Sequence, residues 1–318
     1  MRMFILRQLS NNINTNVASI TVISILLLIT INILSSVISV ANVYNSNLKN
    51  NNLSDFTING TFYALGEPHI FAVESLVHEE RFQKYVKEFA LYDLYQSDEL
   101  TLETLLTPAV KERIHKEEPA ALFKRNISLM KESDFHRLME VMHQPDLIFD
   151  ITPEQYLLAA NLQQMVTYYQ PTLQDHHLLS FQGHSLAPAT TTVLVTSLNN
   201  SSNANNQGVL IVDDSLLFPL EKNETKLVGN YNTFDTPEHI ETAFTAFIAE
   251  KLKNKRTTEF LLTRQTMEIA GIGLGVIVSF VGLYVGIIFA ICCVTILAVK
   301  QLSETSDTKE RYQLLRKL

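Results

Sequence analysis

Cysteine is almost absent from this sequence of 318 residues, which contains only Cys292 and Cys293, side by side. Both lie in a long apolar run, where a free cysteine behaves as a small apolar packing residue. The large segment 43–268 therefore has no disulfide, although secreted eukaryotic domains commonly carry them. This scarcity excludes a disulfide-stapled fold and favours a domain on a bacterial surface.

Charged residues are missing from two long stretches. None occurs between Arg7 and Lys49, and none between Glu268 and Lys300. The second run has 31 residues, which at about 1.5 Å per residue would reach ~46 Å, more than the ~30 Å apolar core of a bilayer. It must tilt or begin outside the membrane. The first run could alternatively be a cleaved signal peptide instead of a membrane span. Its apolar part, however, is far longer than the ~7–15 residues usual in signal peptides.

The basic residues set the predicted orientation, because lysine and arginine near span ends favour the cytoplasmic side. They flank the apolar runs at both chain ends, at Arg2, Arg7, Lys300, Lys309, Arg311, Arg316 and Lys317. We therefore expect a bacterial cell-membrane protein with two transmembrane α-helices flanking a large extracytoplasmic mixed α/β domain, and with both termini in the cytoplasm. The predicted parts are a cytoplasmic segment 1–16, a transmembrane helix 17–42, an extracytoplasmic domain 43–268 with a C-terminal helical stalk, a transmembrane helix 269–299 and a cytoplasmic coupling segment 300–318.

The external segment is acidic, with 18 basic and 30 acidic residues over 44–268. This balance disfavours nucleic acid as a partner and is compatible either with cationic ligands or with an ordinary solvated acidic surface.

Alternating and periodic apolar patterns predict a mixture of strands and helices in this segment. The expected strands are 56–65, with Gly60 as a bulge, 190–198, 208–212 and 226–231. The expected helices are 77–95, 103–116, 120–130, 135–142, one starting at Thr152-Pro153, and one starting at Thr236-Pro237 that continues as the stalk into the second span. The asparagine-rich stretch 199–207 predicts a flexible, solvent-facing loop.

Catalytic and nucleotide-binding patterns are missing. No G-x-x-x-x-G-K-[ST] loop occurs, and no Ser/His/Asp or Cys/His arrangement can be argued, so we expect neither an enzyme nor a bound cofactor. His176, His177 and His184 do not have zinc-site spacing, so no metal site is expected there. Asp213 and Asp214 follow a predicted strand, where turn residues are commoner than a cation-binding or acid/base pair.

Small residues follow the second apolar run at intervals of four. Such rows let neighbouring helices approach closely, and they predict a helix-packing surface. The two rows are Gly271, Gly275 and Ser279, and Gly282, Gly286 and Ala290.

The charged tail after the second run predicts a separate basic helix. Asp307 is suited to cap it, with Glu310 three residues later and Tyr312 and Leu315 as apolar contacts. This helix either rests on anionic lipid or docks on a cytoplasmic motor.

The tail also resembles a known family. It contains Gln301, Ser303, Arg311, Tyr312, Leu315, Arg316, Lys317 and Leu318 in the order Q-x-S followed by R-Y-x-x-L-R-K-L. This pattern is similar to that of FtsX-like, MacB-related permease subunits of bacterial ABC transporters, of the bacitracin-type antimicrobial-peptide resistance and sensing group. Full members have further spans and are about twice as long, so the chain looks like a truncated member.

The resemblance implies a cytoplasmic ATPase as partner, further permease helices and, for signalling, a sensor histidine kinase. It implies antimicrobial peptides, or the cell-wall lipid intermediates that they capture, as ligands. Residues Arg311, Tyr312, Leu315, Arg316 and Lys317 would then couple the chain to the ATPase. Two other classes stay open, a two-span sensor of external ligands and a surface interaction protein without transport activity.

Overall fold

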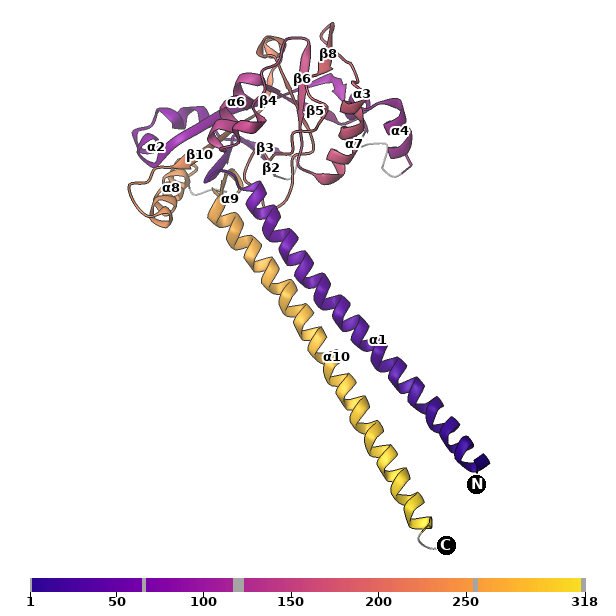
Figure 1. Ribbon diagram of the computed structural model, residues 1–318. Coiled ribbons are helices and arrows are strands. Elements are labelled where there is room, and N and C mark those ends of the chain that lie inside the picture. Colours follow the sequence, from indigo (N-terminus) through magenta and orange to yellow (C-terminus); the bar gives the residue numbers. More distant parts are fainter. Residues whose placement is uncertain (1, 65–66, 117–122, 254–256, 316–318) are drawn as a thin grey trace. The chain divides into compact units, whose positions relative to one another are not determined.

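The computed structural model describes residues 2–64, 67–116, 123–253 and 257–315. The chain divides into two compact units (Figure 1). One consists of Met1–Asn45 and Ile272–Leu318, and the other of Ser46–Gly271. The two apolar runs of the sequence thus belong to one unit, and the mixed segment between them forms the other.

The first unit consists of most of two long helices, α1 (Arg2–Asn51) and α10 (Arg264–Leu315), which lie side by side in it (Figure 1). The end of α1 and the start of α10, residues 46–51 and 264–271, belong to the second unit. Within them, Thr21–Asn51 and Ser279–Ser303 are long and apolar enough to cross a membrane. Most large apolar side chains there are exposed, such as Ile31 at 65% and Phe280 at 68%. So much uncovered apolar surface is unusual for a protein surrounded by water.

A nine-stranded mixed sheet organises the second unit, in the order β11-β1-β10-β4-β5-β9-β6-β8-β7. The β5/β9 and β6/β8 pairs are parallel, and the other neighbours are antiparallel. A separate hairpin is formed by β2 and β3. The strands are β1 (Phe56–Asn59), β2 (Thr61–Ala64), β3 (Glu67–Ile70), β4 (Val86–Thr101), β5 (Asn126–Lys131), β6 (Gln155–Ala159), β7 (Leu179–Phe181), β8 (His184–Pro188), β9 (Val209–Val212), β10 (Lys222–Tyr231) and β11 (Leu261–Thr263).

Short helices cover the sheet. They are η1 (Val73–His78), α2 (Glu80–Tyr85), α3 (Leu102–Leu105), α4 (Pro108–Ile114), α6 (Glu132–Val141), η2 (Pro145–Leu147), α7 (Gln163–Gln174), η3 (Asp214–Leu217), α8 (Pro237–Lys251) and α9 (Thr257–Phe260). Together with the two long helices and the sheet, they confirm the predicted combination of two apolar helices with a mixed α/β domain.

The central strands are buried on both faces. In β6, Leu158 packs in a cluster with α4 and α7, whereas its neighbour Leu157 packs in a second cluster with α6. Successive strand residues point to opposite faces, so a strand covered on both sides needs a continuous apolar sequence. A third cluster joins α2 and α8 to β1 and β10.

Several predicted elements are wrong. The helix expected over 77–95 is α2 followed by β4, because Ala90, Tyr92 and Leu94 alternate inward with the period of a strand. The first residues of the helix expected over 120–130, up to 122, lie outside the described residues, and from Asn126 the segment forms β5 instead of a helix. Strand 190–198 is replaced by an irregular segment with one isolated bridge, between Ala159 and Leu194.

One predicted helix start and one predicted bulge also differ. The Thr152-Pro153 sequence leads into β6 rather than into a helix, whereas Thr236-Pro237 does begin α8. At Gly60, β1 and β2 are separate strands because the glycine approaches the neighbouring backbone. A Cβ atom at Gly60 would lie 2.6 Å from the carbonyl oxygen of Thr225, which excludes any side chain.

The predicted helical stalk does not continue into the second span. Helix α8 ends at Lys251, and Lys253 has a positive φ of 52°, a left-handed conformation typical of helix ends. Strand β11 then pairs with β1, Leu262 lying opposite Thr57, before α10 begins at Arg264. The sheet thus separates the two helices.

Candidate functional site

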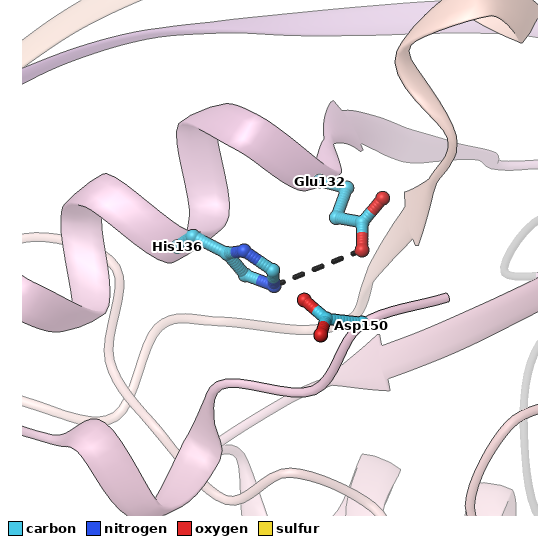
Figure 2. Close-up of side chains that lie close together, drawn as sticks. All are labelled: Glu132, His136 and Asp150. Carbon is cyan, nitrogen blue, oxygen red and sulfur yellow. Dashed lines mark ion pairs between the residues drawn. The ribbon is translucent and has the colours of Figure 1, made fainter. Parts of the chain in front are cut away.

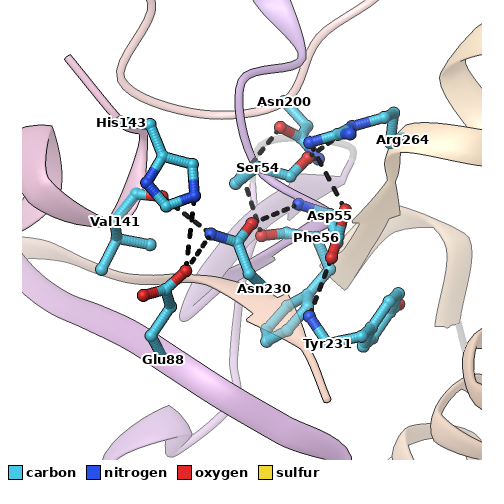
Figure 3. Close-up of polar contacts among 10 residues, drawn as sticks. All are labelled: Ser54, Asp55, Phe56, Glu88, Val141, His143, Asn200, Asn230, Tyr231 and Arg264. Carbon is cyan, nitrogen blue, oxygen red and sulfur yellow. Dashed lines mark hydrogen bonds and ion pairs between the residues drawn. The ribbon is translucent and has the colours of Figure 1, made fainter. Parts of the chain in front are cut away.

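The connection between α1 and β1 is held by a buried asparagine. Asn200 is fully buried, although the stretch 199–207 was expected to be a solvent-facing loop. Its Nδ2 donates to the Ser54 carbonyl oxygen at 3.0 Å, and its Oδ1 accepts from Ser54 Oγ at 2.9 Å (Figure 3). Its backbone N–H donates to Thr57 Oγ1 at 2.8 Å. The prediction is wrong for Asn200, because these bonds fix that end of the loop against the root of β1, whereas Asn203, Asn205 and Gln207 are exposed as expected.

Asp55 joins the start of α10 to the sheet. Its carbonyl oxygen accepts from the Arg264 backbone N–H at 2.8 Å, and its carboxylate lies 3.4 Å from Arg264 Nη2 (Figure 3). The other carboxylate oxygen accepts from the Tyr231 N–H at 2.8 Å. Because the ion pair is partly exposed, it adds only ~0–1 kcal/mol. The position of Arg264 is fixed by this backbone bond and by a hydrogen bond from its Nε to the Ser54 carbonyl oxygen at 3.2 Å.

Asn230 extends these contacts across the sheet. Its Oδ1 accepts from the Asp55 N–H at 3.1 Å, and its Nδ2 donates to the Val141 carbonyl oxygen at 2.7 Å and to Glu88 Oε1 at 3.0 Å (Figure 3). One amide therefore links the α1–β1 connection to α6 and β4.

The last residues of α1 are held in the same way. Asn52 exchanges bonds with the Ser201 backbone at 3.1 Å in both directions. Asn161 Nδ2 donates to Asn51 Oδ1 at 2.9 Å. An asparagine amide both donates and accepts, so it can bridge two backbones. We call this set the root network, and it consists of Asn51, Asn52, Ser54, Asp55, Asn161, Asn200, Ser201, Asn230 and Arg264.

The pockets lined by described residues of the sheet unit include two of substantial volume. One, of about 280 Å³, is lined by β4, β5, β10 and the 199–208 loop, and its charged groups are already engaged, Lys226 with Glu224 at 3.4 Å and Arg125 with Gln207 at 2.7 Å. The other, of about 510 Å³, lies next to Asp55 and Arg264 and is rich in carboxylates.

A cluster of possible metal ligands links α6 to the segment before β6. The ligand atoms of Glu132, His136 and Asp150 all lie within 4.8 Å of one another (Figure 2). His136 Nε2 is 3.1 Å from the Phe149 carbonyl oxygen, and Glu132 Oε1 accepts from the Ile151 N–H at 2.7 Å. These bonds already engage the facing atoms of Glu132 and His136, so the two side chains hold segment 149–151 on α6.

The sequence also drew attention to the pair Asp213 and Asp214 and to a group of three histidines. Asp213 accepts from the Ser215 N–H at 3.0 Å and caps η3, whereas Asp214 accepts from Ser133 Oγ at 2.6 Å. The turn interpretation is thereby confirmed. His176, His177 and His184 belong to no metal-ligand group among the described residues.

Two of the predicted packing residues lie in the contact between α1 and α10. A Cβ atom at Gly282 would lie 2.1 Å from Val37 Cγ2, and one at Gly286 would lie 3.3 Å from Leu34 Cδ2. Ser279 and Ala290 are exposed. The surroundings of Gly271 and Gly275 lie outside the described residues.

The tail continues α10 without a break. Arg311, Tyr312 and Leu315 are in its last turns, whereas Arg316 and Lys317 lie outside the described residues. The predicted new helix start at Asp307 is wrong, because α10 runs through that residue.

Comparisons with known proteins give no family. No protein-family model matches the sequence, and no curated protein matches it. A solved structure described as a "Putative Lipoprotein from Bacillus anthracis" aligns with 65% of this chain and 96% of its own, at 8% identity and a TM-score of 0.33. That score is too low to establish a shared fold.

Proposed function

We propose that this chain is a permease subunit of a bacterial ABC transporter for antimicrobial-peptide resistance or sensing. Helices α1 and α10 would cross the cell membrane, with the sheet unit outside and both termini inside. A partner ATPase in the cytoplasm would supply the energy, since no ATP-binding loop occurs in the sequence. The similarity of the tail, from Gln301 to Leu318, to the permease pattern supports this assignment.

The root network is the observation that carries the proposal. It holds the last residue of α1 through Asn51, the next residue through Asn52, and the first residue of α10 through Asp55. A displacement of the connected strands would therefore reach both helices together. This arrangement suits a domain whose movement is linked to movement in the membrane, and it supports transport or signalling over passive display.

The tail variants test the proposal. In the full chain, Tyr312→Asp combined with Leu315→Asp should lower the recovery of an ATP-binding cassette subunit from native membranes at least tenfold. Charged side chains would disrupt an apolar docking contact. The measurement is quantitative mass spectrometry of proteins purified with the tagged chain.

The matched control is Ser306→Asp, which adds a charge at an exposed position of the same helix outside the coupling residues. It should leave recovery unchanged. If the unmodified chain brings down no ATP-binding cassette subunit, the transporter proposal fails. Recovery of a histidine kinase alone would favour a two-span sensor.

A further inference from the structure

The smaller pocket of the sheet unit is rich in amide side chains. It has a volume of about 280 Å³ and is lined by strands β4, β5 and β10, by α7 and by the 199–208 loop. We call it the amide pocket, after the lining residues Gln96, Asn126, Asn199, Asn205, Asn206 and Gln207. Each amide can both donate and accept hydrogen bonds, so this lining suits a ligand whose own groups do the same.

Two buried tyrosines hold the ends of the loop that borders the amide pocket. Tyr92 Oη donates to the Leu198 carbonyl oxygen at 2.7 Å, and Tyr169 Oη donates to the Gln207 carbonyl oxygen at 2.7 Å. Burial raises the pKa of both hydroxyl groups, so they stay protonated and remain donors. The ends of the loop are thus fixed before any ligand arrives, which lowers the entropy cost of binding.

Three polar side chains of the amide pocket are free to bind a ligand. Within the part of the chain that the structure describes, Gln96, Ser128 and Asn205 make no side-chain hydrogen bond. Gln96 on β4 lies opposite Ser128 on β5, so these two side chains are neighbours on one face of the sheet. Asn205 belongs to the loop. A ligand would therefore be bound from the sheet and from the loop at once, and it would replace water and no protein partner.

The charged groups of the amide pocket favour an uncharged ligand. Lys226 Nζ lies 3.4 Å from Glu224 Oε2, so these two charges compensate each other. Arg125 is exposed, and its Nη1 donates to Gln207 Oε1 at 2.7 Å. The lining residues therefore carry a net charge of only one, and the amides outnumber the charged groups.

The size of the amide pocket and its apolar atoms narrow the choice of ligand. Its volume lies just below the ~300–1,000 Å³ of sites for drug-sized molecules, which suits a single ring. Leu94, Met165 and Leu198 add apolar atoms to the lining. A sugar ring has hydroxyl groups around its edge, which both donate and accept, and apolar C–H groups on its faces. One amide side chain can bridge two neighbouring hydroxyl groups of such a ring.

We propose that the amide pocket binds one ring of a neutral sugar, with Gln96, Ser128 and Asn205 as its hydrogen-bond partners. Such a ring occurs both as a free monosaccharide and as a unit of a glycan chain. The loop also carries Asn200 and Ser201 of the root network. A bound sugar would thus contact the segment that holds the end of α1.

Saturation-transfer difference NMR of the full chain in lipid nanodiscs tests the site. The probes are glucose, galactose, N-acetylglucosamine and its trimer chitotriose, and empty nanodiscs give the baseline. At least one probe should show saturable binding at millimolar concentration. Gln96→Met combined with Asn205→Ala should weaken that binding at least fivefold, because each lost hydrogen bond is worth ~0.5–1.5 kcal/mol.

The matched control is Gln163→Met combined with Asn203→Ala, the same two exchanges at exposed amides outside the pocket. It should leave the affinity unchanged. Both double variants replace exposed side chains, so their thermal unfolding midpoints should stay close to that of the unmodified chain. A loss of binding in the pocket variant alone would then report on the site and not on the fold.

The outcomes separate the sources of the sugar. Chitotriose binding at least tenfold more tightly than N-acetylglucosamine indicates a glycan chain, and a monosaccharide binding as tightly as chitotriose indicates a single ring. If no sugar binds, if calorimetry shows binding of inorganic phosphate alone, or if the pocket variant binds as well as the unmodified chain, the inference is overturned. The measurement contains no ATPase, so its failure would leave the proposed transporter function untouched.

Discussion

Replacing Gly282 with leucine is expected to separate α1 from α10. The ideal Cβ position at Gly282 already lies 2.1 Å from Val37 Cγ2, so even one carbon atom requires the Val37 side chain or a helix to move, and a leucine requires more space still. Close approach through small residues is a principal source of helix association in membranes, where the hydrophobic effect is absent. A leucine side chain at position 282 is therefore expected to force α1 and α10 apart instead of repacking within their contact.

Disulfide cross-linking measures this effect. In a chain with Cys292→Ala and Cys293→Ala, the pair Leu34→Cys and Gly286→Cys should cross-link readily, because a Cβ at Gly286 lies 3.5 Å from Leu34 Cγ. Adding Gly282→Leu should lower the yield at least fivefold.

The control is Val281→Leu, which also enlarges a side chain but at a position that is 55% exposed. It should leave the cross-linking yield unchanged. An equal yield in the Gly282→Leu chain would mean that the two helices do not pack through this residue.

Removing the side-chain amide of Asn200 should destabilise the sheet unit by about 1–3 kcal/mol. Asn200→Ala removes two buried hydrogen bonds to Ser54. The Ser54 hydroxyl keeps the Phe56 carbonyl oxygen as an acceptor at 3.3 Å, and the Ser54 carbonyl oxygen keeps the Arg264 Nε–H as a donor at 3.2 Å. The loss is therefore that of two typical bonds, at ~0.5–1.5 kcal/mol each. The midpoint of thermal unfolding, followed by circular dichroism, should fall by roughly 2–12 °C.

Asn203→Ala is the matched control, since Asn203 is exposed and lies in the same loop. Its unfolding midpoint should stay close to that of the unmodified chain. If Asn200→Ala were as stable as Asn203→Ala, the root network would not hold the loop, and the argument for coupled helices would lose its support.

The sequence predicts some elements well because their signals are local. A run without charged residues predicts a long apolar helix, and Thr236 followed by Pro237 correctly predicts the start of α8, although the same pair at Thr152-Pro153 leads into β6. The same holds for the apolar strand β9. Segment 77–95 fails because its apolar residues satisfy a helical and an alternating pattern at once, and only pairing with β10 decides for a strand.

The candidate site could be predicted only in part. The row containing Gly282 and Gly286 is visible from spacing alone. The root network is not, because Ser54 and Asn200 are 146 residues apart and their partnership depends on the sheet. The asparagine clusters at 50–52 and 199–206 were its signal, but polar composition fits a flexible loop equally well. The end of α8 could not be predicted from the sequence either. Lys253 adopts the left-handed conformation there, which at helix ends is usually adopted by glycine or asparagine.

The central claim is that the chain crosses the membrane twice with the sheet unit outside. Labelling of intact cells with an impermeant maleimide tests it, in a chain with Cys292→Ala and Cys293→Ala. Phe218→Cys replaces a side chain that is 92% exposed in the sheet unit, and Thr305→Cys lies in the exposed tail of α10. We predict that Phe218→Cys reacts in intact cells and that Thr305→Cys reacts only after permeabilisation. Protection of Phe218→Cys, or labelling of Thr305→Cys in intact cells, would contradict this topology.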